Sequence, residues 1–393
     1  RDYEDLKARF KGSNFDQFHK GDWFAQIVQW LLESYAKQVD AAYLRQHYPG
    51  VSPANQAKKA IQLAARFNAI AGGMSASAVT ALELSSLGPQ ALATVPAVGV
   101  LVMADVAYST RTQLRTTYDL SVIHSAPLAV DDVEDCYLVF LTAMGAKVQE
   151  MTGGIGKTVG PHVVAYNVRK LLRAGVRKTL QELLKKIGGA WLARKLTERA
   201  LMRLLVPGIN IPIASKFNHY FTKKVLLGAN GTMHRRGEVV RPLVRLYTRE
   251  QALPKTTAIK ALIAVIETGD PDGWSEEQMN ALRYCQQTLV LSDRDMSELD
   301  EYFDRQIEDV LKEVTSLAPP ALSDLAQLTM VASALFPDDR HDVRYCEAIV
   351  KISARSSVPM SEAEVSKRIQ RLRSSLLGRK TVDEQPSPEH ATP

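Results

Sequence analysis

The chain has 393 residues, of which 46 % are hydrophobic and 23 % charged, and its formal net charge is +6. This length exceeds what one core holds in most soluble folds, and the proportions exclude a disordered or fibrous protein, so two or three globular domains are expected. The three cysteines, Cys136, Cys285 and Cys346, have no spacing typical of a disulfide framework or a zinc site, which favours a reducing, cytoplasmic compartment. The charged N-terminus lacks an apolar signal core, although a chain that begins at Arg1 is compatible with a trimmed leader.

Basic and acidic residues are distributed unevenly along the chain. Residues 161–249 contain 19 Lys and Arg against three acids, a local net charge of about +16. From residue 250 onward, 25 acids face 16 bases. Because opposite charges attract, the basic and acidic regions are candidates to pair within one molecule.

Helical periodicity dominates, and no set of alternating strands joined by hairpin turns is found, so the predicted class is all-α. Residues 22–44 are predicted to form a first helix within an N-terminal helical extension, residues 1–51. Ser52 before Pro53 predicts the start of a second helix, which runs toward Gly72-Gly73 and opens a multi-helix domain.

The stretch from Leu84 to Ala104 contains 21 residues without a charge, which is long enough to span a bilayer. Pro89 and Pro96 interrupt it, and its Ser, Thr, Gln and Gly residues make transfer into lipid weakly favourable at best. A buried apolar Gly/Ala-rich helical hairpin is therefore the favoured interpretation. A hairpin that inserts into the membrane remains the main alternative, ahead of a spanning helix.

Residues 105–145 read as two helices divided by Ser125-Ala126-Pro127, and residues 163–187 follow as an amphipathic helix. One side of the 163–187 helix is apolar, and the opposite side is basic. The basic side is the candidate surface for binding anions, and its residues are Lys170, Arg173, Arg177, Lys178 and Lys185. Such a face suits an anionic membrane surface. The basic face equally suits docking on the acidic C-terminal half or on another protein. Binding to nucleic acid is disfavoured, because the sequence has no helix-turn-helix, zinc-finger or RNA-binding motif.

The acidic C-terminal region, residues 250–377, contains a weak internal repeat with a period of about 61 residues. Leu282-Arg283-Tyr284-Cys285 is echoed by Val343-Arg344-Tyr345-Cys346, which predicts two copies of one helical unit packed face to face. The polar tail, residues 378–393, has three prolines and is predicted to be disordered.

Three motifs invite a chemical interpretation, and none is complete. Residues 152–158 resemble a phosphate-binding loop but lack its first glycine, and Gly160-Pro161 breaks the helix that should follow. Asp270, Asp272, Glu276 and Glu277 lack the spacing of a calcium loop and fit a turn before a helix capped by Ser275. His219 lies in an aromatic run and reads as a core or interface residue. No catalytic, cofactor-binding or metal-binding residue is therefore assigned, and no cofactor is expected.

A family resemblance rests on two segments. Asp105-Val106-Ala107 with Thr110–Arg115 and Tyr118-Asp119-Leu120 resembles the most characteristic region of EcsC-family proteins, and residues 206–224 resemble that family's apolar Pro/Gly turn and the Asn-containing helix after it. The resemblance covers roughly residues 52–236, within a domain taken as residues 52–249. It marks five residues as structural: Asp105, Arg111, Tyr118, Asp119 and Asn218. Asp105, Asp119 and Arg111 would form a buried ion pair or network between helices, and a ligand site is the alternative.

The C-terminal region resembles TerB-like helical domains more loosely. The EcsC family has no settled biochemical activity, and its namesake is encoded beside an exporter, while TerB-like domains are associated with stress-response systems at membranes. Together the two resemblances imply a bacterial, non-enzymatic accessory or scaffold protein, cytoplasmic and peripheral on the inner face of the cell membrane. The alternatives are a soluble structural subunit of a larger assembly without lipid contact and, third, a hydrolase with an unrecognised site.

Overall fold

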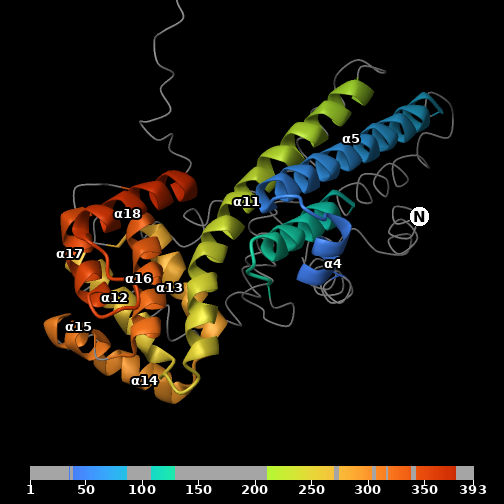
Figure 1. Cartoon of the computed structure of the whole chain (residues 1–393). Helices are drawn as coiled ribbons and strands as arrows, with labels where there is room; N and C mark the ends of the chain where they lie inside the picture. Colours follow the sequence, from blue (N-terminus) through green and yellow to red (C-terminus); the bar gives the residue numbers. More distant parts are fainter. Residues whose placement is uncertain are drawn as a thin grey trace, which may run out of the picture. The chain divides into compact units, whose positions relative to one another are not determined.

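The computed structural model describes residue 35 and residues 39–85, 108–128, 210–269, 274–302, 307–315, 317–337 and 342–377. The protein is all-α, as predicted, and the described ranges contain no strand. The helices are a helix of residues 108–123, without a label in Figure 1, together with α4 (Ala41–His47), α5 (Pro53–Ser85), α11 (Asn210–Arg249), α12 (Thr256–Gly269), α13 (Glu276–Leu289), α14 (Asp293–Tyr302), α15 (Ile307–Thr315), α16 (Pro319–Ala334), α17 (Asp342–Ser353) and α18 (Glu362–Leu377).

The described residues fall into two compact units, one up to Met233 and one from His234 onward, so the division lies inside α11. The N-terminal unit contains α4, α5, the 108–123 helix and the first part of α11. The C-terminal unit contains the last part of α11 and α12 to α18. The domain boundary predicted at residue 249 falls at the last residue of α11, whereas the two compact units divide between Met233 and His234.

Two predicted helix ends in the N-terminal unit are corrected. Val39 and Asp40 are not helical, so the helix predicted for residues 22–44 is interrupted there. Asp40 adopts an extended backbone, and its side chain accepts a hydrogen bond from the Tyr43 backbone N–H at 2.7 Å, which starts a separate helix, α4. Helix α5 begins at Pro53, as predicted, but continues through Gly72-Gly73 to Ser85.

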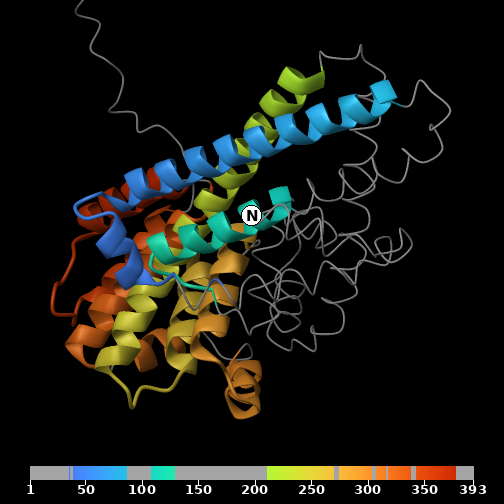
Figure 2. The ribbon, with the colours of Figure 1, turned by 90° about the vertical axis from the view of Figure 1, so that its right-hand side faces the viewer.

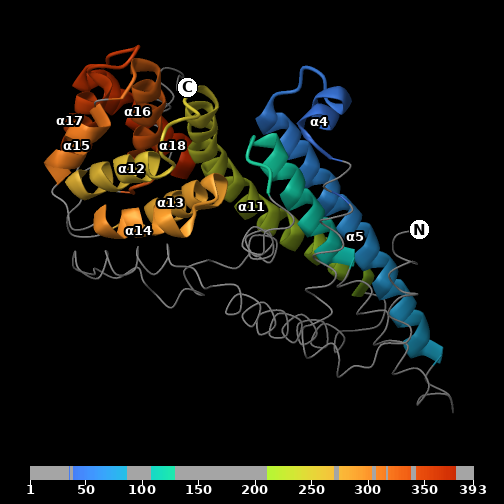
Figure 3. The ribbon, with the colours of Figure 1, turned by 90° about the horizontal axis from the view of Figure 1, so that it is seen from below.

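Gly72, the first residue of this pair, allows close helix packing. In Figures 1 and 3, α5 and the first part of α11 run side by side. A Cβ atom added to Gly72 would lie 2.1 Å from Asn218 Nδ2 and 3.3 Å from the Ala214 carbonyl oxygen, so only glycine allows this approach. The 108–123 helix, teal in Figure 2, lies along the same pair. Gln113 and Asn68 both donate to the Thr222 hydroxyl of α11, at 3.5 and 2.9 Å.

The C-terminal unit is built around α12, which is buried along most of its length and contacts α13, α14, α15, α16 and α17. The cap predicted at Ser275 is confirmed. Ser275 Oγ accepts from the Gln278 N–H at 3.2 Å, and Gln278 Oε1 accepts from the Ser275 N–H at 2.9 Å. The break predicted at Ser125-Ala126-Pro127 is also present, with Ser125 in a left-handed conformation, φ 61°.

Candidate functional site

Several predicted features lie outside the described residues. These are the basic helix with Lys170, Arg173, Arg177, Lys178 and Lys185, the phosphate-loop-like segment, most of the apolar stretch of residues 84–104, the Asp270–Asp272 turn, Asp105 and the tail. The predictions made for them stay predictions.

The other residues marked by the family resemblance lie inside the N-terminal unit. Arg111, Tyr118 and Asn218 are buried, and Asp119 is half-buried. Asn218 fits against Gly72, and its side-chain amide donates to the Asn68 carbonyl oxygen at 3.4 Å. These side chains are therefore components of the helix interfaces rather than of an open site.

Asp119 belongs to a small aromatic and charged cluster. The Tyr35 hydroxyl donates to Asp119 Oδ1 at 2.9 Å, the Arg115 guanidinium lies 4.9 Å above the centre of the Tyr35 ring, and Tyr118 packs edge-on against that ring at 6.1 Å. Burial raises the pKa of Asp119 to about 7, although the Tyr35 hydrogen bond and the Arg115 charge both lower it. Burial and the neighbouring Asp119 raise the pKa of Tyr35 and of Tyr118. Ionisation of Asp119 is thus disfavoured in the folded state.

The interface between α5, the 108–123 helix and α11 is unusually polar. Asn68, Gln113 and Thr222 are all at most 1 % exposed. Asn68 Oδ1 and Gln113 Oε1 accept no hydrogen bond, which leaves two buried amide oxygens unsatisfied. Amides and hydroxyls without an adjacent base are poor nucleophiles, so this interior specifies helix register rather than a reaction.

The outer side of α5 is strongly apolar. Leu63, Phe67, Ile70 and Met74 are 44, 53, 59 and 61 % exposed. Their spacing of four, three and four residues places them in one line along the helix. These four residues are termed the α5 stripe. Large apolar side chains in such a line mark an interaction surface.

Exposed cations accompany the α5 stripe. Lys58, Lys59 and Arg66 are exposed on α5, and the first part of α11 exposes Lys216, Lys223 and Lys224 beside Tyr220 and Leu227. None of these six cations forms an ion pair in the structure, and Asp40 is the one exposed acid among the described side chains of this unit. The described part of the N-terminal unit therefore exposes basic and apolar side chains together.

The arginines in the last part of α11 behave differently, because they pair within the C-terminal unit. Arg235 contacts Glu277 at 3.1 Å, and Arg245 and Arg249 contact Asp324 at 3.2 and 3.4 Å. Arg236 donates to Gln287 at 3.2 Å, and its guanidinium lies 5.6 Å from the centre of the Tyr284 ring. Part of the basic region, residues 235–249, thus neutralises acids of the C-terminal region, while its described cations before residue 234 do not.

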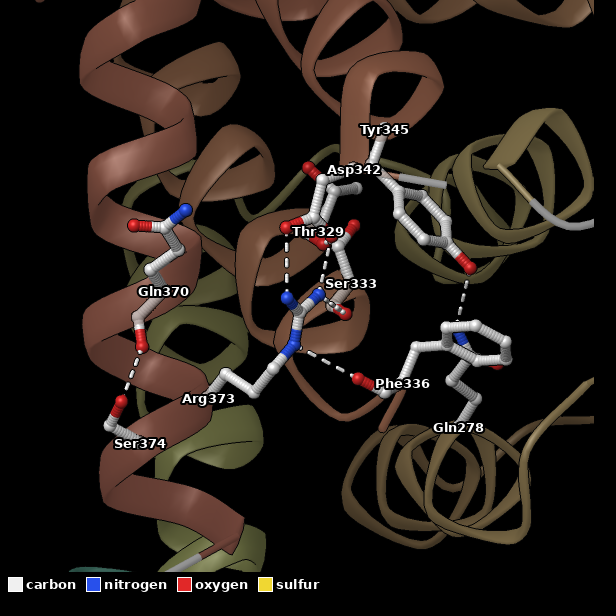
Figure 4. Close-up of polar contacts among 9 residues, drawn as sticks. All are labelled: Gln278, Thr329, Ser333, Phe336, Asp342, Tyr345, Gln370, Arg373 and Ser374. Carbon is white, nitrogen blue, oxygen red and sulfur yellow. Dashed lines mark hydrogen bonds and ion pairs between the residues drawn. The ribbon is translucent and has the colours of Figure 1, made fainter. Parts of the chain in front are cut away.

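A second buried polar cluster ties the C-terminal unit together (Figure 4). Arg373 Nη1 and Nη2 of α18 donate to the two carboxylate oxygens of Asp342 at 2.8 and 2.5 Å, and Arg373 Nε donates to the Phe336 carbonyl oxygen at 3.0 Å. Nearby, Gln278 Nε2 donates to the Tyr345 hydroxyl at 3.1 Å and joins α13 to α17, the helices that carry the two repeat copies. The guanidinium is bound by protein acceptors on both edges, so the cluster is structural.

No described group of three or more His, Cys, Asp and Glu side chains is arranged to hold a metal ion. Within the described ranges, no helix combines the length and apolarity that crossing a bilayer requires. Comparison with protein-family models, with curated proteins and with solved structures found no match in any of the three.

The sequence interpretation missed the α5 stripe. The signal was present, because α5 has two apolar lines: small or buried residues that include Ile61, Ala65 and Gly72, and the larger residues of the stripe. A helix with apolar residues on two separate faces has one face more than its own fold buries.

Proposed function

We propose that this chain is a non-enzymatic accessory or scaffold protein of the EcsC type, with a TerB-like C-terminal region, that binds the anionic surface of a membrane in a stress, export or envelope system. The observation that carries the proposal is the α5 stripe together with six unpaired cations on the exposed surface of the N-terminal unit. The inner face of the cell membrane is the anionic surface that a cytoplasmic protein meets.

Two contributions would stabilise binding of this surface to a membrane. Burying the exposed half of a Leu, Phe, Ile or Met side chain in the interfacial region stabilises binding by about 1 kcal/mol. Each Lys or Arg held near anionic lipid adds on the order of 1 kcal/mol. Four apolar side chains and several cations on one unit therefore supply enough free energy for reversible binding on a membrane. The predicted basic helix of residues 163–187 would add five bases to the same effect.

One observation favours the alternative of a soluble subunit in a larger assembly. The spacing of Leu63, Phe67, Ile70 and Met74 also matches the seam of a coiled coil, so a partner helix could cover the α5 stripe. The exposed cations beside the α5 stripe favour a membrane over a partner helix. A helical partner needs acids opposite Lys59 and Arg66, whereas an anionic bilayer supplies them at any register.

Flotation with phosphatidylcholine vesicles, with and without phosphatidylglycerol, tests the proposal. We expect the wild-type protein to float with the anionic vesicles only, and to do so less as salt rises, because charges at a surface are screened within about 8 Å at physiological ionic strength. Replacing Phe67 and Ile70 together by Ser should lower the affinity for the anionic vesicles about thirtyfold, since about 1 kcal/mol is lost at each position.

The matched control replaces two equally exposed apolar residues of the C-terminal unit, Val343 and Val358, by Ser. This control should float like the wild type. A wild-type protein that ignores anionic vesicles at low salt overturns the proposal. Co-purification of a protein partner that the Phe67→Ser, Ile70→Ser variant loses, with no vesicle binding, would establish the soluble alternative.

A further inference from the structure

A concavity of about 590 Å³ lies at the beginning of α5. The turn before the helix forms one wall, and the first three turns of α5 form the other. Its polar lining consists of Ser52, Asn55, Lys58, Lys59 and Gln62, beside the backbone of Gly50 and Val51. Among the described residues, no acid lines it and neither Lys58 nor Lys59 forms an ion pair.

The turn wall is held in place by local hydrogen bonds. Gly50 adopts φ +70°, a conformation that other residues rarely adopt, and the Val51 N–H donates to the Tyr48 carbonyl oxygen at 3.3 Å. Gln56 Nε2 donates to the Val51 carbonyl oxygen at 2.7 Å, which fixes the turn against the helix. The concavity is thus a preformed feature of the chain, and binding there would require little ordering of the backbone.

The lining selects an anion of a particular kind. Lys58 and Lys59 supply two positive charges, and Asn55, Gln62 and Ser52 supply neutral donors. A phosphomonoester carries close to two negative charges near neutral pH and has three terminal acceptor oxygens, whereas a phosphodiester carries one charge and two such oxygens. Two cations with several donors therefore match the phosphomonoester better.

The concavity also adjoins the α5 stripe. Lys59 lines the concavity, and Leu63, the first residue of the stripe, follows one helical turn later on the same side. We propose that this concavity binds the phosphomonoester headgroup of an anionic membrane lipid while the stripe rests on the acyl boundary beside it. The inference rests on the proposed function, because it assigns a lipid class to the same surface.

The test compares phosphatidylcholine vesicles that contain either phosphatidic acid, a phosphomonoester, or phosphatidylglycerol, a phosphodiester, at compositions adjusted to equal zeta potential. The wild-type protein should bind the phosphatidic acid vesicles roughly tenfold more tightly, as expected for one or two added charge-assisted hydrogen bonds. Replacing Lys58 and Lys59 by Gln should abolish this preference. Both side chains are exposed, so the variant should keep the melting temperature of the wild type.

The matched control replaces Lys223 and Lys224 of α11 by Gln, which removes the same charge from outside the concavity. It should weaken binding to both vesicles alike and leave their ratio unchanged. Equal wild-type affinity for the two lipids overturns the headgroup inference and leaves membrane binding standing. A preference that survives in the Lys58→Gln, Lys59→Gln variant also overturns it. Binding to neither vesicle overturns the membrane proposal itself.

Discussion

Asp119 lies beside Tyr35 and Arg115, and these two neighbours only partly offset the effect of burial on its carboxyl group. Its pKa is raised from 3.8 to about 7, so the folded protein binds a proton here that the unfolded chain has already released. Between these two pH values the folded state holds more protons, and the free energy of unfolding therefore falls as pH rises from about 4 to about 7. The slope that this group contributes is at most about 1.4 kcal/mol per pH unit.

We expect Asp119→Asn to remove this contribution, because the amide has no ionisation to disfavour. Denaturant unfolding of the wild type and the variant, followed across that pH range, measures the difference. Tyr35→Phe should act in the opposite direction: it deletes the hydrogen bond that lowers the pKa, so the loss of stability should extend to higher pH. Parallel pH profiles for the wild type and Asp119→Asn would show that the carboxyl group is not buried in this way.

At the residue scale, the sequence allowed part of this arrangement to be anticipated. Asp105, Arg111 and Asp119 predict a buried ion pair or network between helices; Arg111 is buried and Asp119 half-buried, while Asp105 lies outside the described residues. The partner of Asp119 could not be predicted, because Tyr35 lies 84 residues earlier in the chain and only the fold brings the two together. Periodicity carries no information about pairings at that separation.

Gly72 and Gly73 are neighbours in α5 with different surroundings, so substitution of Gly73 is a control for substitution of Gly72. We expect Gly72→Ala to destabilise the protein by about 1–3 kcal/mol, because the new Cβ would lie 2.1 Å from Asn218 Nδ2 and must displace that buried amide. Gly73→Ala meets only Ser215 Cβ at 3.8 Å, an ordinary contact. Since alanine favours the helix by about 1 kcal/mol, this second variant should be neutral or stabilising. Thermal unfolding of both variants provides the measurement.

Removing the obstructing side chain provides a further check on the same contact. If the Asn218 amide is what Gly72 accommodates, adding Asn218→Ala to Gly72→Ala should cost less than the sum of the two single changes. Additive effects, or a Gly73→Ala variant as unstable as Gly72→Ala, would contradict the packing of α5 against α11.

At the scale of elements, the reliable sequence signals were those that act within a single helical turn. Ser275 and Pro53 mark helix starts because capping and the fixed proline φ act within one turn. Gly72-Gly73 read as the end of a helix, since glycine lowers helix propensity, but tertiary packing outweighs that cost and α5 continues to Ser85. Pro242 likewise lies inside α11.

Over the whole molecule, the sequence revealed the excess of positive charge in residues 161–249 but not how it is used. The structure divides the described part of that region within α11. The arginines from residue 235 onward pair with acids such as Glu277 and Asp324, whereas Lys216, Lys223 and Lys224 are exposed and form no ion pair. Charge counts cannot separate these roles, because pairing depends on which face of the helix meets an acid.

The last part of α11 should therefore be required by the C-terminal unit. Its Val239, Leu243 and Leu246 are at most 1 % exposed, and burial of each stabilises by about 1.5–3 kcal/mol. We expect a fragment of residues 234–377 to unfold cooperatively and reversibly. A fragment of residues 250–377, which begins at the boundary predicted from composition, should melt more than about 10 °C lower or lack a cooperative transition. Thermal unfolding of the two fragments, followed by circular dichroism, tests this expectation. Equal melting temperatures would show that residues 234–249 do not belong to this unit's core.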